Sequence, residues 1–218
     1  MAAFLNQETK QSDARFCADS YGKIASEIFA PLYPYYANII VERTGVRSGV
    51  CLDAGCGGGH LGMAVAERTG MRICFLDSSA QMLELARRNA RERGLSGGFD
   101  TVEATVESIP LPPEAVDLVV SRGSIPFWSD LTAAFSELFR VLKPGGHAYV
   151  GGGLGPMAIR AEIQRAMRDR DAAWRKDRQR NIPQRTVEEY AQALDEAGIG
   201  ERVIERGDEG TWIRFQKL

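Results

Sequence analysis

The residues of this chain best suited to holding a polar ligand are an acidic side chain and the glycines that follow it. In the stretch VCLDAGCGGGHLG, residues 50–62, Asp53 ends a short apolar run, and Gly55, Gly57 and Gly59 follow at every second position. Glycines let a backbone approach a ligand without Cβ clashes, and a helix that begins after them presents unpaired N–H groups. We therefore expect a strand, a tight turn and a helix N-terminus that together cradle a polar ligand.

A second acidic residue ends the next apolar run. Asp77 follows the run 72–76 and lies 22 positions beyond Gly55. A carboxylate at the tip of the second strand of an α/β nucleotide-binding fold binds ribose hydroxyls. Ser78 comes next, and the spacing Ser78-x-x-Gln81 predicts a capping box that opens a helix reaching Gly94.

Strands and helices that would position these residues alternate along the chain. Strands are expected at about 50–53, 72–76, 99–104, 116–121 and 147–150, and helices at 60–68, at 78–94 and from Asp130 onward. The glycines at 151–153 are expected to break this pattern. Two further strands at about 202–206 and 211–217 are joined by a turn too short for a parallel crossover. The predicted fold is α/β, with a doubly wound, mostly parallel seven-stranded sheet that closes in a C-terminal antiparallel hairpin.

Helical segments are expected on both sides of this pattern. Residues 1–45 predict an N-terminal helical cap, with helices at 12–30 and 35–44, and residues 46–218 predict the ligand-binding domain. A lid-like insertion follows the fifth strand at about 154–185, and Thr186-x-x-Glu189 predicts a capping box for the next helix. Tyr21 and Tyr33 belong to an aromatic-rich stretch of the cap, where they either pack the helices onto the sheet or line a substrate pocket.

Bulk composition excludes several classes of function. The chain has 218 residues, a net charge of −2 and a pI near 5.8, which does not favour a protein that coats nucleic acid or membrane surfaces. Its apolar runs fall short of the roughly 18 residues of a membrane span, and a cytoplasmic location is expected. The four irregularly spaced cysteines predict reduced, packing side chains, and with two histidines no metal site is expected.

The strand with DAGCGGG, the strand that ends in Asp77, the LKPGG segment and the terminal hairpin together resemble the class I S-adenosylmethionine (SAM) dependent methyltransferases over residues 46–218. The small-molecule subgroup called type 11 is the most similar. The resemblance implies a Rossmann-like methyltransferase fold, SAM as methyl donor, S-adenosylhomocysteine (SAH) as product, and in-line transfer to a small-molecule acceptor. The cofactor-binding residues that it implies are Asp53, Gly55, Cys56, Gly57, Gly59, Asp77, Ser78, Thr105, Val106 and Ser121.

Each of these positions has an expected partner in SAM. The resemblance implies that Asp53 and the glycine turn meet the amino acid part, Asp77 the ribose, and Ser121 with Arg122 the methionine portion. Family members commonly carry an Asp after the third strand to accept from the adenine amino group, but this chain has Thr105 there. The adjacent backbone N–H of Val106 is expected to meet the ring.

Residues near the expected acceptor carry several interpretations. Arg122, just past a strand end, could clamp a carboxylate or phosphate of the substrate or the carboxylate of SAM, or it could pair with the cofactor-binding acids or cap a helix. Trp128 could wall the pocket or pack in the core, and His60 is expected to be neutral because of the helix N-terminus. Methyl transfer does not require a general base, and Glu27 and Asp130 are the candidates if one is used.

Two alternatives remain open from the sequence. Residues 57–62 match GxGxxG, which is typical of NAD-type oxidoreductases, although Asp53 would repel a diphosphate placed near it. The expected helix 157–180 is rich in arginine, and residues 160–185 hold nine Arg or Lys against four Asp or Glu. It is expected to be a solvated lid, but an RNA or protein methyltransferase could use it for docking.

Overall fold

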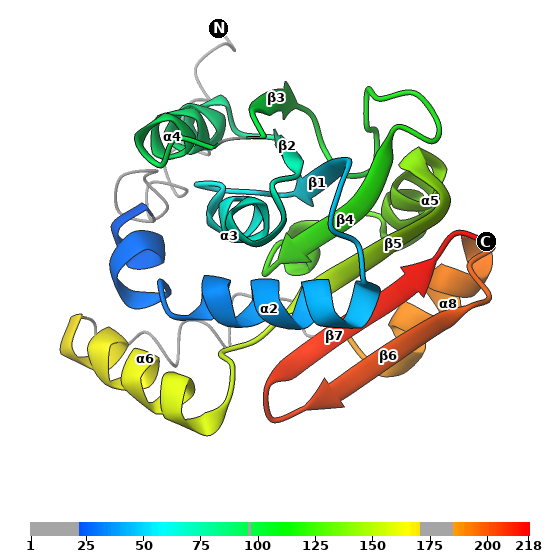
Figure 1. Cartoon of the computed structure of the whole chain (residues 1–218). Coiled ribbons are helices and arrows are strands. Elements are labelled where there is room, and N and C mark those ends of the chain that lie inside the picture. The colour runs from blue at the N-terminus through cyan, green and yellow to red at the C-terminus, as the bar shows by residue number, and fades with distance from the viewer. Residues whose placement is uncertain (1–21, 96, 171–184) are drawn as a thin grey trace, which may run out of the picture.

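A single seven-stranded sheet forms the centre of the molecule (Figure 1). The computed structural model describes residues 22–95, 97–170 and 185–218. The strands are β1 (Val50–Ala54), β2 (Arg72–Asp77), β3 (Phe99–Glu103), β4 (Val116–Arg122), β5 (Leu142–Gly152), β6 (Arg202–Gly207) and β7 (Gly210–Gln216). Their order across the sheet is β3-β2-β1-β4-β5-β7-β6, and β7 alone runs in the opposite direction to the other strands. The predicted sheet, with its reversed strand in a terminal hairpin, is confirmed.

Helices cover both faces of this sheet (Figure 1). Alternate residues of a strand point to opposite faces, so Cys51 packs on the side of α2, α3 and α4, whereas Leu52 packs on the side of α5 and α8. The helical elements are η1 (Ile24–Ile28), α2 (Leu32–Thr44), α3 (His60–Thr69), α4 (Ala80–Glu92), η2 (Ile125–Phe127), α5 (Leu131–Val141), α6 (Met157–Arg170) and α8 (Val187–Glu196).

The N-terminal helices pack into the hydrophobic core on one face of the sheet, and α2 forms hydrogen bonds to the segments at one end of β5 and β7. Tyr36 of α2 is 1% exposed, and its hydroxyl donates to the carbonyl of Glu209 at 2.9 Å and accepts from the N–H of Gly155 at 2.9 Å. The neighbouring Tyr35 donates to the Glu209 carboxylate at 2.7 Å. These bonds hold α2, the second helix of the predicted cap, against the β6–β7 turn and the segment after β5.

Most predicted helix boundaries are confirmed to within a residue or two. The Thr186 and Glu189 capping box is present, and α5 begins after Asp130. The second cap helix begins at Leu32, three residues earlier than expected, with Pro31 in the N-cap position. Of the expected helix 12–30, the structure describes only the part from residue 22, and of the helix 157–180 only α6.

Two local predictions were wrong. The cap of α4 is Ser79, whose hydroxyl accepts from Met82 N, and not Ser78, because the Asp77 carboxylate accepts from Ser79 N and moves the helix start by one residue. The glycines after Val150 do not end β5, since Gly151 and Gly152 pair with β7. A Cβ at Gly151 would lie 2.3 Å from the Thr211 carbonyl oxygen, so glycine is what allows the hairpin to approach.

The cysteines in the described residues agree with the expectation of reduced, packing side chains. Cys51 and Cys74 are buried, Cys56 is partly buried, and all three are free thiols. Cys17 lies outside the described residues. None of the described helices is both long and apolar enough to cross a membrane.

Candidate active site

Asp53 lies at the carboxyl end of β1, buried beneath the glycine turn. It is 2% exposed, and its Oδ2 accepts from the N–H of Gly62 at 2.9 Å. The pKa of Asp53 is raised to about 7, because burial, together with the negative charge of Asp77, outweighs the opposing effect of the Gly62 hydrogen bond. A cation that comes close to such a buried carboxyl group stabilises its ionised form.

The turn after β1 has a backbone conformation that favours glycine. Gly55, Gly57 and Gly59 have φ angles of 66°, 52° and 77°. A Cβ at Gly59 would lie 2.8 Å from the Phe75 ring, and one at Gly55 would lie 2.4 Å from Cβ of Ser124. The turn therefore presents bare backbone at the edge of the sheet, as a cradle for a polar ligand requires.

Asp77 joins this turn to the start of α4. Its Oδ2 accepts from Gly57 N at 2.8 Å and its Oδ1 from Ser79 N at 3.0 Å. Each carboxylate oxygen keeps a further lone pair, so both can still accept from the hydroxyls of a diol. Ser78 is exposed, and Cys56 donates its N–H to the Leu76 carbonyl at 2.9 Å.

The segment after β3 is held beside Asp77. Ala104 N donates to the carbonyl oxygen of Asp77 at 3.1 Å, which keeps the following residues at the tip of β2. Thr105 is exposed, whereas Val106 is 5% exposed and packs on the α5 side of the sheet. An apolar side chain beside backbone polar groups is the kind of surface that suits a heteroaromatic ring.

Ser124, which the sequence did not single out, connects the other side of the site. Its hydroxyl lies 2.6 Å from that of Ser121, donates to the Ala54 carbonyl at 3.1 Å and accepts from Trp128 Nε1 at 3.1 Å. Trp128 is 5% exposed and packs against Phe135, so it belongs to the core. The sequence offered no signal for Ser124, because its bond to the Ala54 carbonyl joins residues 70 positions apart.

Arg122 and the cap meet at the end of β4. The guanidinium of Arg122 lies 5.2 Å from the ring centre of Phe29 and 5.5 Å from that of Tyr33, and its Nη2 donates to the Gly153 carbonyl at 3.0 Å. Tyr33 also stacks on His60, with ring centres 5.0 Å apart. The cap therefore brings Tyr33 to the site, whereas Tyr21 lies outside the described residues.

His60 is neutral, as expected, but the main cause is burial and not the helix N-terminus. Burial lowers its pKa to about 4, and the charge of Arg93 adds to this effect. Neither ring nitrogen has a hydrogen-bond partner in the described part of the chain. A neutral imidazole stacked on Tyr33 forms a wall here and does not repel a cation.

The two candidate bases lie in exposed positions. Asp130 is exposed, and its carboxylate caps α5 by accepting from Ala133 N at 2.9 Å. Glu27 is exposed on η1. The described residues contain no cluster of three or more His, Cys, Asp or Glu side chains able to hold a metal ion.

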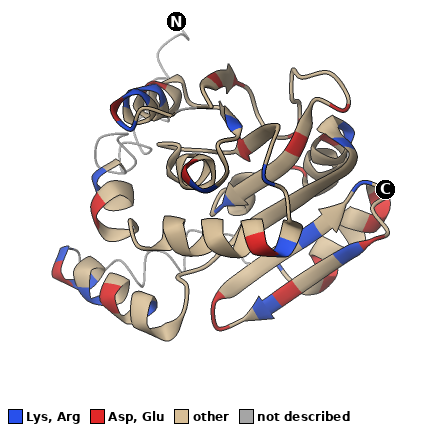
Figure 2. Cartoon of the chain, in the orientation of Figure 1, with Lys and Arg blue, Asp and Glu red and all other residues tan. Residues whose placement is uncertain are grey.

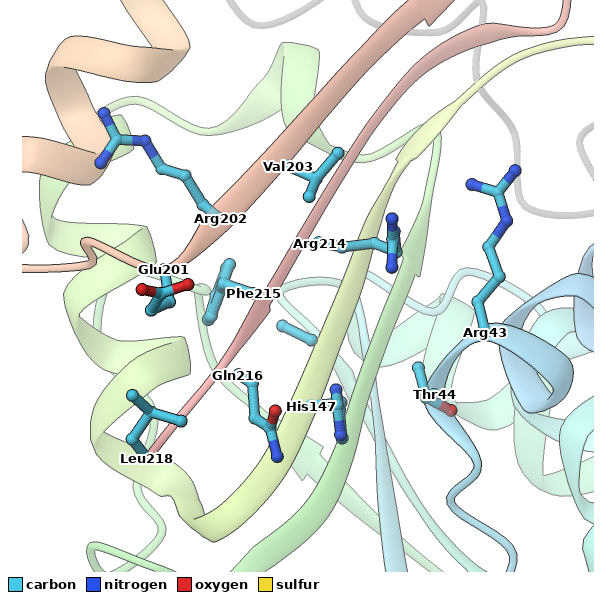
Figure 3. Close-up of a pocket in the computed structure, with 11 residues that line it drawn as sticks. Arg43, Thr44, His147, Glu201, Arg202, Val203, Arg214, Phe215, Gln216 and Leu218 are labelled. Carbon is cyan, nitrogen blue, oxygen red and sulfur yellow. The ribbon is translucent and has the colours of Figure 1, made fainter.

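Two hollows lie outside this constellation. Figure 3 shows the first, about 200 Å³, with Arg43, His147 and Arg214 around it. Arg43 and Arg214 at this hollow pair with Glu205. The hollow lies beside His147 of β5, whereas Arg122 lies opposite Gly151, near the end of that strand. The second, about 270 Å³, lies between η1 and α4.

The donor set at the strand ends fits SAM. Asp53 offers a buried carboxyl for an ammonium group, Asp77 offers two oxygens for a ribose diol, and the segment at Val106 offers an apolar side chain and backbone groups for adenine. The strand order β3-β2-β1 arranges these three features in the sequence adenine, ribose and amino acid, the order in which SAM carries them. The fold is that of an α/β protein, and its donor set matches a nucleoside with an amino acid tail.

Comparisons with known proteins agree with this class. A family profile described as "Methyltransferase domain" matches residues 52–150. A Methanococcus maripaludis protein, assigned to the S-adenosylmethionine-dependent methyltransferases in the description of its crystal structure, is 39% identical, with a TM-score of 0.85 and 92% of each chain covered. The chain therefore belongs to the class I SAM-dependent methyltransferases, a family of enzymes whose cofactor is SAM.

Curated relatives match a smaller part. An uncharacterized protein of Mycobacterium tuberculosis is 31% identical over 134 residues, which is 61% of this chain and 46% of that protein. The malonyl-[acyl-carrier protein] O-methyltransferase of Yersinia pestis is 40% identical over 97 residues, 44% of this chain and 34% of that enzyme. The chain thus spans less than half the length of the curated relatives that it matches.

Proposed function

We propose that this chain transfers a methyl group from SAM to a small-molecule acceptor by in-line displacement, releasing SAH. The observation that carries the proposal is the order of the features along the sheet edge, from Val106 through Asp77 to Asp53. This order supports one ligand lying across β3, β2 and β1. The family assignment disfavours the oxidoreductase alternative, and the buried Asp53 would oppose a pyrophosphate in the same turn.

Each part of the proposed cofactor site has a distinct task. The Asp53 carboxyl receives the ammonium group, Asp77 receives the ribose hydroxyls, and the Val106 backbone meets adenine. Ser121 and Ser124 hold the end of β4 against the Ala54 carbonyl, which fixes the turn relative to the acceptor side. When bound, SAM supplies an activated methyl group on a positively charged sulfur.

Positioning is the main contribution that the protein makes to this reaction. Alignment of a nucleophile about 3 Å from the methyl carbon and exclusion of water account for much of the rate of such a displacement. The cap of η1 and α2 supports this role, because Tyr33 and Phe29 approach the end of β4 and Tyr36 fastens α2 to the opposite turn. The exposed positions of Glu27 and Asp130 favour a reaction without a dedicated base.

Docking of a macromolecule through the arginine-rich helix is less favoured by the charges. The described part of this helix, α6, carries Arg160, Arg165, Arg168 and Arg170 together with Glu162 and Asp169. Figure 2 shows basic and acidic residues interleaved along α6. An interleaved pattern is typical of a solvated helix rather than of a nucleic-acid surface.

Calorimetric titration of the protein with SAH and, separately, with NADH tests the proposed function. We expect SAH to bind with a dissociation constant on the order of 1–100 µM, within the range usual for enzyme ligands. Asp77→Asn should weaken SAH about tenfold to a hundredfold, because hydrogen bonds to a charged acceptor are lost. Asp208→Asn, in the exposed hairpin turn, is the matched control. NADH binding without SAH binding would overturn the proposal.

A further inference from the structure

Arg122 is held rigidly at the mouth of the site. The faces of two rings from the cap, Phe29 and Tyr33, lie against its guanidinium, and Nη2 donates to the Gly153 carbonyl. The contacts come from the η1–α2 segment, from α2 and from the end of β5. A long flexible side chain fixed by three separate segments has already lost the conformational entropy that binding would otherwise cost.

This guanidinium lacks an anionic partner in the described part of the chain. Its Nε is buried without a hydrogen-bond acceptor, and no carboxylate forms an ion pair with it there. Arg140 shows the contrast, because it donates to the Glu137 carboxylate and to the carbonyls of Ile109 and Leu111. A buried donor without an acceptor costs about 1–3 kcal/mol, so the arrangement is unfavourable for folding alone.

Space beside Arg122 is open to a ligand. A Cβ built on the next residue, Gly123, would meet no atom within 4 Å, and Gly123 is exposed. Arg122 is itself partly exposed, so the end of β4 borders solvent here although its Nε is buried. The aromatic rings cover its faces, which directs an incoming oxyanion to the in-plane N–H groups.

Register places Arg122 outside the span proposed for the cofactor. Val120 pairs with Asp53, so Arg122 lies two residues further along β4, about 7 Å toward the mouth at the usual rise per residue. β4 is also one strand further from Asp77 than β1 is. The amino acid end of SAM is proposed to meet Asp53. Arg122 therefore lies beyond that end of the cofactor, toward the mouth of the site.

We propose that Arg122 binds an oxyanion, a carboxylate or phosphate, of the methyl acceptor, so that the enzyme selects anionic acceptors. This inference rests on the proposed methyltransferase function and specifies its substrate class. Phe29 and Tyr33 supply apolar walls next to the charge, which suits an acceptor whose anionic group is attached to a flat or apolar body. The alternative oxyanion that Arg122 would bind is the carboxylate of SAM itself.

Binding of small probes to the SAH-saturated protein tests the inference. Benzoate, phenyl phosphate and the neutral benzamide are titrated by calorimetry into wild type, Arg122→Gln and the control Arg165→Gln on the exposed face of α6. We expect benzoate or phenyl phosphate to bind at least about tenfold more tightly than benzamide in wild type and in the control, as expected for charge-assisted hydrogen bonds. Arg122→Gln should lose this discrimination while its SAH affinity changes less than about threefold.

Other results overturn the inference in distinguishable ways. Equal binding of benzoate and benzamide by wild type would show that no anion site exists, and unchanged discrimination in Arg122→Gln would place it elsewhere. A tenfold loss of SAH affinity in Arg122→Gln would assign the arginine to the cofactor carboxylate. If circular dichroism shows that this variant is unfolded, Arg122→Lys, which keeps the charge but not the planar fork, should show reduced discrimination, and full discrimination would refute the role of the fork. Failure of wild type to bind SAH would overturn the proposed function instead.

Discussion

Asp53→Asn is predicted to stabilise the ligand-free protein at neutral pH while it weakens cofactor binding. Burial raises the pKa of Asp53 from 3.8 to about 7, so the folded state prefers the protonated form. Asparagine keeps an oxygen that can accept from Gly62 N but carries no charge. At about 1.4 kcal/mol per pH unit, ionisation of the buried carboxyl costs the folded state roughly 4 kcal/mol at pH 8.

The sign of the pH dependence follows from the direction of this change. Because the pKa of Asp53 is higher in the folded state, the contribution of this carboxyl group to stability is fully present below pH 3.8 and is lost as pH rises through about 7. His60 acts in the opposite sense, since burial lowers its pKa from 6.5 to about 4, and its contribution is lost as pH falls through about 4. The two changes overlap, so only the difference between wild type and Asp53→Asn isolates the carboxyl group.

Chemical denaturation of both proteins from pH 4 to pH 8 without ligand measures this difference. The free energy of unfolding of wild type minus that of Asp53→Asn should fall by roughly 4 kcal/mol over this range. SAH affinity of wild type should rise up to about tenfold per pH unit below pH 7, because the bound ammonium requires the ionised carboxyl. A stability difference that stays constant within about 1 kcal/mol would refute the burial argument.

Three further substitutions have outcomes fixed by local geometry. Gly62→Ala should destabilise the fold by about 1–3 kcal/mol in denaturant titrations, because its Cβ would lie 2.8–3.0 Å from core atoms and from the Asp53 carboxylate. Thr186→Ala removes the capping box of α8 and should cost about 1 kcal/mol without any change in SAH affinity by calorimetry. Tyr36→Phe leaves Gly155 N–H without its partner and should lower stability by about 1–3 kcal/mol, with faster hydrogen exchange at that amide.

Local sequence patterns predicted the sheet because each strand and turn carries its own signal. The apolar run before Asp53, the acid that ends β2 and the short 207–210 turn were sufficient for a mostly parallel sheet with one reversed strand. Errors occurred where a tertiary contact overrides the local pattern. Gly151 continues β5 because β7 approaches it closely, and Ser79 replaces Ser78 as a cap because Asp77 binds its N–H.

Contacts around the proposed acceptor site could not be predicted in the same way. Arg122 was recognisable as a residue at a strand end, but its enclosure depends on Phe29 and Tyr33, about ninety positions earlier in the chain. The tie between Tyr36 and Glu209 joins residues 173 positions apart. Such pairs have no sequence spacing that marks them, because the fold alone brings them together.

A comparison of two acids in this chain shows why Asp53 is assigned to a ligand and not to the fold. Asp117, at the opposite end of the sheet, accepts from Val50 N at 2.8 Å and pairs with the ammonium of Lys143 at 2.8 Å, so its charge is satisfied within the protein. Asp53 is more deeply buried, yet in the described residues it has one backbone donor and no cation. Its ionised form is therefore unfavourable until a positive group arrives, and the stability lost by burying it is recovered when an ammonium ligand binds.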